Sequence, residues 1–233
     1  MLALKTVAQT QPAPAKVPRS DGVQARGRLL ETALRLFAEK GFGKTSIRQI
    51  AQAAGANVAA ISYYFGDKAG LYRAAFTEPM GCAQGDVEFY DQPQFTLRQS
   101  LGVFMQRFLE PMKQGELVQH CTRLHFREML EPTGVWADEI NHGIKPAHAA
   151  LVALLGRHLR VTRPDDDLHR LAFCITGLAL QLFITRDVVQ AIRPRLLNQP
   201  AAIDAWAADL VDYAEAMVAI EVRRRKKTGP PPT

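Results

Sequence analysis

Apolar residues recur every three to four positions along most of this 233-residue chain, which is the period of an amphipathic α-helix. The first such stripe lies in a helix predicted over residues 23–40 and ended by Gly41. Its apolar members are Leu29, Leu30, Ala33, Leu36 and Phe37. No segment alternates apolar and polar residues as a half-buried strand does, and no repeat is evident. The pattern therefore predicts an all-α fold.

Two short helices separated by a glycine turn are predicted next. Thr45 is placed to cap the first of them, which extends to Ala54 and is ended by a left-handed turn at Gly55. Asn57 is a natural cap for the second, over residues 58–65. In that second helix the inward positions are Val58, Ile61 and Phe65, and the mostly outward ones are Ala59, Ala60, Ser62, Tyr63 and Tyr64.

The surroundings of this pair of helices favour contact with DNA. Gly66 ends the second helix, and Asp67 caps a further helix with Lys68 beside its N-terminus, well placed for a phosphate. A short helix with small residues in front and basic residues around it suits the major groove, which admits one helix. A buried hairpin in an ordinary bundle is the alternative, but it has no reason to turn tyrosines and basic side chains outward together.

The stretch LLETALRLFAEKGFGKTSIRQIAQAAGANVAAISYYFGDKAGLY, within residues 26–76, resembles the N-terminal domain of the TetR family of transcriptional regulators. It departs from the family pattern at Ala59, often glycine, and at Ser62, often tyrosine. The resemblance implies that residues 58–65 enter the major groove, with Ala59, Ala60 and Tyr64 towards bases. The full set of predicted DNA contacts is Thr45, Arg48, Asn57, Ala59, Ala60, Tyr63, Tyr64 and Lys68. FGDKAGLYRA and FREMLEPTG resemble a subgroup associated with drug-sensitivity and transport genes.

The chain divides into a head, a connector and a second helical region. We predict a disordered tail over residues 1–22, a helix-turn-helix domain over 23–78, a connector over 79–95, a helical bundle for effector binding and dimerisation over 96–227, and a disordered tail over 228–233. In the bundle, helices are predicted over residues 96–114, 116–131, 135–159 with a kink at Pro146, 167–191 and 200–226. The helix over 167–191 is apolar enough for burial on most sides.

The resemblance also implies how the bundle is used. In the TetR family the final helices usually pair across a twofold axis, and two heads then bind a palindromic site at successive major grooves. Internal burial of the last two helices is the alternative. The family's C-terminal domains commonly bind small-molecule effectors, so the predicted function is a homodimeric repressor that an effector releases from operator DNA.

Cys121, His125 and Glu128 fall at positions i, i+4 and i+7, hence on one face of a helix. Thiolate, imidazole and carboxylate are all ligands of soft metals, yet no second well-spaced cluster is visible. The same groups also suit the polar part of a small-molecule pocket, or a satisfied polar patch with no ligand. The expected apolar wall of such a pocket is Phe104, Phe108, Met129, Trp136, Phe173, Gln181 and Phe183.

Composition adds limits to this picture. A net charge of +6 and a pI near 9.4 favour nucleic acid or an anionic surface as partner. We see no apolar run of about 18 residues and no apolar signal core, so neither a membrane span nor export is expected. Three widely spaced cysteines do not form a disulfide framework, which fits the cytoplasm. We interpret the basic end over 223–227 as a solvated helix terminus that complements the helix dipole, in preference to a DNA contact.

An enzyme is not predicted, because the chain lacks a glycine-rich phosphate loop, a nucleophile elbow and a metal-hydrolase helix motif. No cofactor or bound metal is expected. The predicted function is therefore transcriptional regulation by a DNA-binding, ligand-responsive homodimer. The alternative is a helical metal-sensing or interaction module that does not recognise a DNA sequence.

Overall fold

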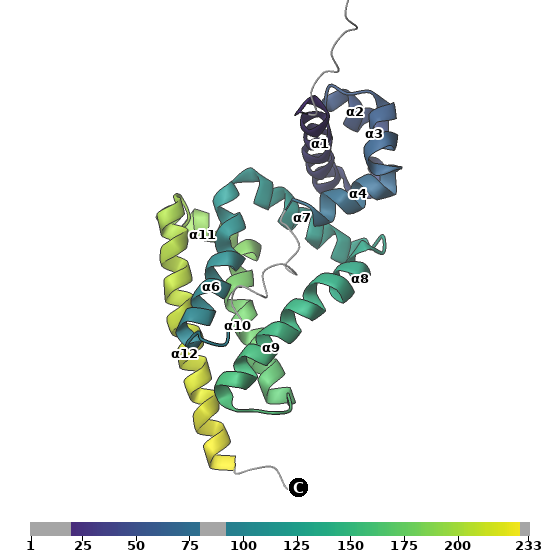
Figure 1. Cartoon of the computed structure of the whole chain (residues 1–233). Helices are drawn as coiled ribbons and strands as arrows, with labels where there is room; N and C mark the ends of the chain where they lie inside the picture. The colour runs from purple at the N-terminus through teal and green to yellow at the C-terminus, as the bar shows by residue number, and fades with distance from the viewer. Residues whose placement is uncertain (1–19, 80–91, 229–233) are drawn as a thin grey trace, which may run out of the picture.

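The computed structural model describes residues 20–79 and 92–228 and arranges them as a small helical head joined to a longer helical bundle (Figure 1). The described ranges contain helices and no strands, which confirms the predicted all-α fold. Residues 1–19 of the tail predicted over 1–22, most of the predicted connector and residues 229–233 lie outside the described residues. Residues 20–22, predicted as part of that tail, belong to the first helix of the head.

Four helices form the head: α1 (Ser20–Lys44), α2 (Ile47–Ala53), α3 (Val58–Phe65) and α4 (Lys68–Thr77). The prediction for α3 is confirmed at both ends. The helical path of α1 breaks at Gly41, whose φ of 81° is a conformation that glycine adopts without strain. Its final residues therefore turn towards α2, as the predicted stop at Gly41 requires.

The helix caps confirm two predictions and correct one. Asn57 accepts a hydrogen bond from the Ala59 amide at 3.0 Å, and Asp67 accepts one from the Gly70 amide at 2.7 Å. The prediction that Thr45 caps α2 is wrong, because Ser46 is the cap and forms a reciprocal capping box with Gln49. The Thr45 side chain is buried instead, and its hydroxyl lies 2.8 Å from the Gly41 carbonyl oxygen.

The bundle follows in chain order. Its helices are α6 (Leu97–Leu109), the 3-10 turn η2 (Glu110–Gln114), α7 (Glu116–Leu130), α8 (Val135–Glu139), the π-helical turn η3 (Ile140–Ile144), α9 (Lys145–Leu159), α10 (Asp166–Ile184), α11 (Arg186–Ile192), the 3-10 turn η4 (Pro194–Leu196) and α12 (Pro200–Thr228). The predicted disturbance at Pro146 is confirmed, since the wider π turn directly precedes it.

Helix α10 departs from its predicted burial on most sides. One face is buried in the bundle, but Phe173, Leu180 and Ile184 are 62%, 45% and 47% exposed on the other. By length and composition, α10 is the helix among the described residues that could cross a membrane. A core helix of a soluble protein passes the same test, and α10 packs against α9 and α12.

Two hydrophobic cores hold the fold. The larger lies inside the bundle, between α6, α9, α10 and α12. The smaller is the core of the head, and it also includes Cys121 and Leu124 of α7 and Val135 of α8. The head is therefore joined to the bundle by shared apolar packing, not by the connector alone.

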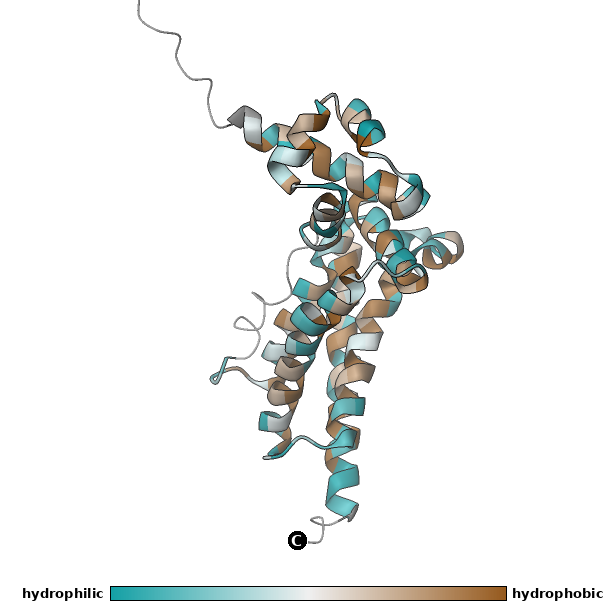
Figure 2. Ribbon diagram, turned by 90° about the vertical axis from the view of Figure 1, so that its right-hand side faces the viewer, coloured by the Kyte–Doolittle hydropathy of each residue, from teal (hydrophilic) through white to brown (hydrophobic). Residues whose placement is uncertain are grey.

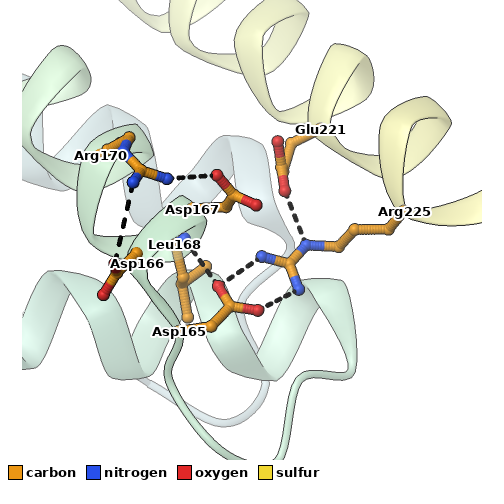
Figure 3. A network of polar contacts seen from close by, with 7 residues as sticks. All are labelled: Asp165, Asp166, Asp167, Leu168, Arg170, Glu221 and Arg225. Carbon is orange, nitrogen blue, oxygen red and sulfur yellow. Dashed lines mark hydrogen bonds and ion pairs between the residues drawn. The ribbon is translucent and has the colours of Figure 1, made fainter. Parts of the chain in front are cut away.

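Arg225 near the end of α12 ties that helix to the start of α10 (Figure 3). Its two terminal nitrogens lie 2.7 and 2.8 Å from the Asp165 carboxylate, and its Nε lies 2.7 Å from Glu221. Asp165 also caps α10 by accepting from the Leu168 amide at 2.9 Å. The Arg225 hydrogen bonds lower the pKa of Asp165 to about 2, so this carboxylate stays ionised in strongly acidic solution.

Asp165→Asn should remove the charge of this pair and keep the cap. We expect a loss of about 1 kcal/mol in the free energy of unfolding at pH 7, because half-exposed pairs are partly screened by solvent. The folded pKa is lowered, so the difference from wild type should be complete above about pH 4 and shrink as the pH falls towards 2. Urea unfolding at several pH values measures the stability difference between the variant and wild type. A difference that does not change with pH contradicts the lowered pKa of Asp165.

Candidate nucleic-acid interface

The outer face of the head is built by α2 and α3. Ile61 of α3 is buried in the head core, whereas Tyr63 is 82% exposed. Of the predicted DNA-binding residues, Arg48, Asn57, Ala59 and Tyr63 are exposed. Further exposed polar residues in or beside α2 and α3 are Lys44, Ser46, Gln49 and Ser62. The exposed side of α3 is therefore Ala59, Ser62 and Tyr63, opposite Val58, Ile61 and Phe65.

Ala60 and Tyr64 lie on the flank of α3. Both are half-buried and pack against the head core, and the Tyr64 ring sits edge-on to Tyr63 at 4.9 Å between ring centres. The sequence predicted both residues to face outward and to meet bases. Helical spacing alone did not reveal that α1 covers this flank.

Two other predicted contacts are already engaged within the protein. The Thr45 hydroxyl is buried, so the predicted backbone contact from this side chain is wrong in this conformation. Lys68 is half-buried, with its Nζ 4.3 Å from the centre of the Phe42 ring. This cation–π contact holds the ammonium beside the α1–α2 turn, and a phosphate would have to compete with the ring for it.

The predicted effector residues do not gather in one place, which corrects that expectation. Phe104 and Phe108 lie in or against the bundle core, with Phe108 edge-on to Phe183 at 5.8 Å between ring centres. Met129, Phe173 and Gln181 are exposed. The remaining four predicted residues, Cys121, His125, Glu128 and Trp136, lie where the head meets the bundle. Helical period defined their faces but not which helix each face meets.

Glu128 is fully buried at this junction and accepts hydrogen bonds from both sides. From the head, the Tyr72 hydroxyl of α4 donates to it at 2.7 Å. From the bundle, the Thr133 amide donates at 2.7 Å and the Trp136 amide at 3.4 Å. Burial and this carboxylate raise the pKa of Tyr72 well above its ordinary value. Glu128 is therefore a buried side chain with satisfied oxygens that joins α4 to the α7–α8 turn.

His125 and Cys121 complete the junction without forming a metal site. The His125 ring stacks on Phe76 of α4 at 4.1 Å between ring centres, and burial lowers its pKa. Burial also raises the pKa of the Cys121 thiol to about 12, which opposes formation of the thiolate that a metal binds. No cluster of three metal-ligating side chains occurs within residues 20–79 and 92–228. Here the satisfied polar patch is the arrangement observed.

A cleft of about 310 Å³ opens beside this junction. Its walls come from α4, the end of α1, the α7–α8 turn and α8, and include Phe42, Tyr72, Arg73, Thr133 and Asp138. Its size is at the lower end of the range of small-molecule pockets. The cleft connects the head and the bundle, so a molecule bound there would touch both.

A helix-turn-helix head with an exposed tyrosine and basic rim, carried on a helical bundle, defines a DNA-binding regulator. The comparisons with known proteins agree. The model of bacterial regulatory proteins of the tetR family matches residues 29–75, and that of the C-terminal domain of the HTH-type transcriptional dual regulator CecR matches residues 97–219. The chain therefore belongs to the TetR family of transcriptional regulators, with a C-terminal domain of the CecR type.

Individual relatives support the same assignment. The HTH-type transcriptional dual regulator CecR of Shigella flexneri is 31% identical over 152 residues, which is 58% of this chain and 64% of that protein. The probable regulator YttP of Bacillus subtilis is 46% identical over 56 residues, or 24% of this chain and 27% of that protein. The matches thus span about a quarter of YttP and just under two thirds of CecR.

A solved structure shows the same fold over most of the chain. The SmeT protein in complex with triclosan aligns with 82% of this chain and 90% of its own, at 19% identity and a TM-score of 0.59. At that identity the likeness concerns the arrangement of the helices alone.

Proposed function

We propose that this protein is a homodimeric repressor that binds a palindromic operator through α3 and is released from it by a small-molecule effector. The observation that carries the proposal is the exposed side of α3, where Tyr63 projects beyond small residues in a chain of the TetR family. The protein would act in the cytoplasm as a regulator and not as an enzyme. No observation favours the metal-sensing alternative, because Cys121 is buried and Glu128 is both buried and hydrogen-bonded.

In this proposal the exposed positions of α3 meet the DNA bases. Ala59, Ser62 and Tyr63 would lie along the major groove, while Arg48, Lys44 and the Ser46–Gln49 cap would meet backbone phosphates. Asn57 would hold the start of α3 in place. The charge of the head supports this use, since residues 20–78 contain eight basic and five acidic residues. Ala60, Tyr64 and Lys68 would act mainly by supporting the position of α3.

Tyr63→Ala should weaken binding to the DNA just upstream of the gene about tenfold or more, or about 1.4 kcal/mol. Tyr64→Ala should instead lower the thermal stability of the head, because its ring packs on the head core. Binding is measured against scrambled DNA at about 150 mM salt, where a specific site is favoured roughly a thousandfold. Equal loss on both DNAs, or a larger specific loss in Tyr64→Ala, contradicts the assignment of Tyr63 to the DNA bases.

Arg48→Ala tests the contact with the DNA phosphates. We expect this substitution to reduce the salt dependence of DNA binding.

The dimer would form through the exposed apolar faces of α10 and α12. On α10 the residues Phe173, Leu180 and Ile184 fall on one side of the helix, with Gly177 between them. On α12 the matching exposed residues are Tyr213 and Ile220. Burial of large apolar faces is the main driving force for association, and a monomer has no reason to expose two such helices.

Leu180→Glu should convert the dimer to a monomer, because the carboxylate would be buried without a partner. Operator binding should then fall by more than tenfold, since two linked heads combine their affinities. Light scattering after gel filtration measures the mass. Leu130→Glu, at an exposed leucine of α7, is the control and should stay dimeric. A dimeric Leu180→Glu protein excludes this face.

Effector binding would act on the junction between α4 and α7. We propose a small molecule as the effector, in keeping with the family to which the chain belongs. The junction cleft and the bundle are its candidate sites. Effector binding must favour a head position that fits the operator less well, and each tenfold loss of DNA affinity requires about 1.4 kcal/mol of coupling.

A further inference from the structure

The end of the bundle farthest from the head collects basic side chains from two separate parts of the chain. We call it the basic tip and define it as residues 157–170 and 221–227. The first part is the end of α9 and the start of α10, and the second is the last two turns of α12. Both lie at the end of the molecule opposite α3 (Figures 1 and 2), where the ribbon of α12 is coloured as hydrophilic.

The two parts of the basic tip are held together by the pairing of Arg225 with Asp165 (Figure 3). The acidic residues of the tip are all engaged in ion pairs. Asp165 and Glu221 pair with Arg225, and Asp166 and Asp167 pair with Arg170. The other basic residues of the tip have exposed side chains and are Arg157, Arg160, Arg163, Arg223, Arg224, Lys226 and Lys227.

The basic tip holds most of the net charge of the protein. It contains nine arginines and lysines and four acidic residues, an excess of five, while the whole chain has a net charge of +6. The head has an excess of only three. The surface opposite the reading helix is therefore more positive than the head that recognises DNA.

Helix dipoles explain part of this clustering of basic residues at the tip. Cations are favourable near the carbonyl end of a helix, and the last turns of α9 and α12 contain Arg157, Arg225, Lys226 and Lys227. The effect fades beyond the last turn, so it does not account for Arg163 in the loop. Arg160, the C-cap of α9, lies within reach of the same dipole.

We propose that the basic tip is a second, sequence-independent DNA-binding surface that holds another duplex while the head is bound to its operator. A protein partner is disfavoured because no large apolar side chain of the tip is exposed. Protein interfaces need buried apolar or aromatic anchors, whereas a phosphate backbone needs cations alone. The protein would thus bridge two segments of DNA.

The separation of the two surfaces permits this arrangement. Helix α12 has 29 residues and is therefore about 44 Å long, and its basic end points away from the head. Charges exposed to solvent are screened over about 8 Å at physiological salt. A duplex on the tip and a duplex on the head would then repel each other only weakly.

The test is a bridging assay with the full-length protein. One random-sequence duplex of about 30 base pairs is fixed on beads, and capture of a second, labelled duplex is measured at about 50 and 150 mM salt. The tip variant combines Arg160→Gln, Arg163→Gln, Lys226→Gln and Lys227→Gln and leaves Arg225 unchanged to preserve the fold. The matched control removes the same charge elsewhere through Arg123→Gln, Lys145→Gln, Arg193→Gln and Arg195→Gln, all at exposed positions.

We expect the tip variant to lose at least about fivefold in capture, with a smaller salt dependence, while the control keeps wild-type capture. Unchanged melting temperatures exclude unfolding as the cause. Equal capture by the tip variant and wild type, or no capture by wild type, overturns the proposal. If the protein binds polyglutamate but captures no duplex, the partner of the basic tip is an acidic protein, and this result also overturns the proposal. Binding to the DNA upstream of the gene is measured in parallel, so the operator function is tested separately.

Discussion

We expect Glu128→Ala to lower the free energy of unfolding by about 3 kcal/mol, which is one of the two largest effects of a single substitution in this protein. The carboxylate is fully buried and accepts from Tyr72 on the head and from Thr133 on the bundle. Its removal leaves buried donors without an acceptor, at about 1–3 kcal/mol each, and opens a small cavity. Urea unfolding followed by circular dichroism measures the loss.

Two variants separate this effect from general damage. Glu131→Ala, at an exposed glutamate one position beyond α7, should change stability by no more than about 0.5 kcal/mol. Tyr72→Phe removes a single hydrogen bond to the carboxylate and should cost about 1.5 kcal/mol. If Glu128→Ala is as stable as Glu131→Ala, the junction does not depend on this carboxylate.

The junction also predicts a dependence on pH. The pKa of Tyr72 is raised in the folded protein, so its contribution to stability is complete below about pH 10 and is lost as the pH rises further. Tyr72→Phe should therefore lose less stability than wild type between neutral pH and the alkaline range. Because the same bonds join α4 to α7, we expect Glu128→Ala to weaken the response of DNA binding to an effector as well.

We expect Gly70→Ala to have the second large effect, because it should disrupt the packing of α4 against α3 in the head. A Cβ at position 70 would lie far inside the contact distance of the Phe65 carbonyl oxygen at the end of α3. Backbone cannot yield as a flexible side chain does, so α4 must move away from α3. We expect a cost of about 3 kcal/mol or more and loss of specific DNA binding.

A glycine in open space provides the matched control. Gly27 lies within α1, and a Cβ at this position would meet nothing within 4 Å beyond its own turn of helix. Gly27→Ala should therefore stabilise the helix by about 0.5–1 kcal/mol. Thermal unfolding and operator binding of the two variants are compared directly. A Gly70→Ala protein that melts like wild type and binds the upstream DNA would refute the close approach of α4 to α3.

The head was largely predictable because its rules are local. The spacing of Ile61 and Phe65 fixed one side of α3, and Asn57 and Asp67 capped α3 and α4 as predicted. The Thr45 prediction failed because two adjacent hydroxyl residues compete for one cap, and the turn at Gly41 buries the first of them. Tyr64 was predicted to face outward and is half-buried instead, since a flank residue is buried or exposed according to its neighbour.

The candidate effector site was less predictable because it depends on contacts between helices. The sequence put Cys121, His125 and Glu128 on one face of α7, and that face is real. It meets α4 of the head instead of the bundle interior, so the three residues make a junction and not a pocket with Phe104. Similarly, the apolar pattern of α10 did not distinguish burial within one chain from an exposed face.

The sequence alone determined most of the helices and the inward face of most of them, because these follow from residue spacing and local hydrogen bonding. It also carried the family resemblance. It did not reveal that the helix predicted over 167–191 ends at Ile184 and is followed by the separate helix α11. The tertiary structure decided which surfaces meet. It brought Tyr72 to Glu128, left Tyr63 exposed while covering Tyr64, and joined the charges of α9 and α12 through Arg225. The physical reason is that burial of apolar surface has no direction, so a stripe requires a covering partner without specifying which helix supplies it.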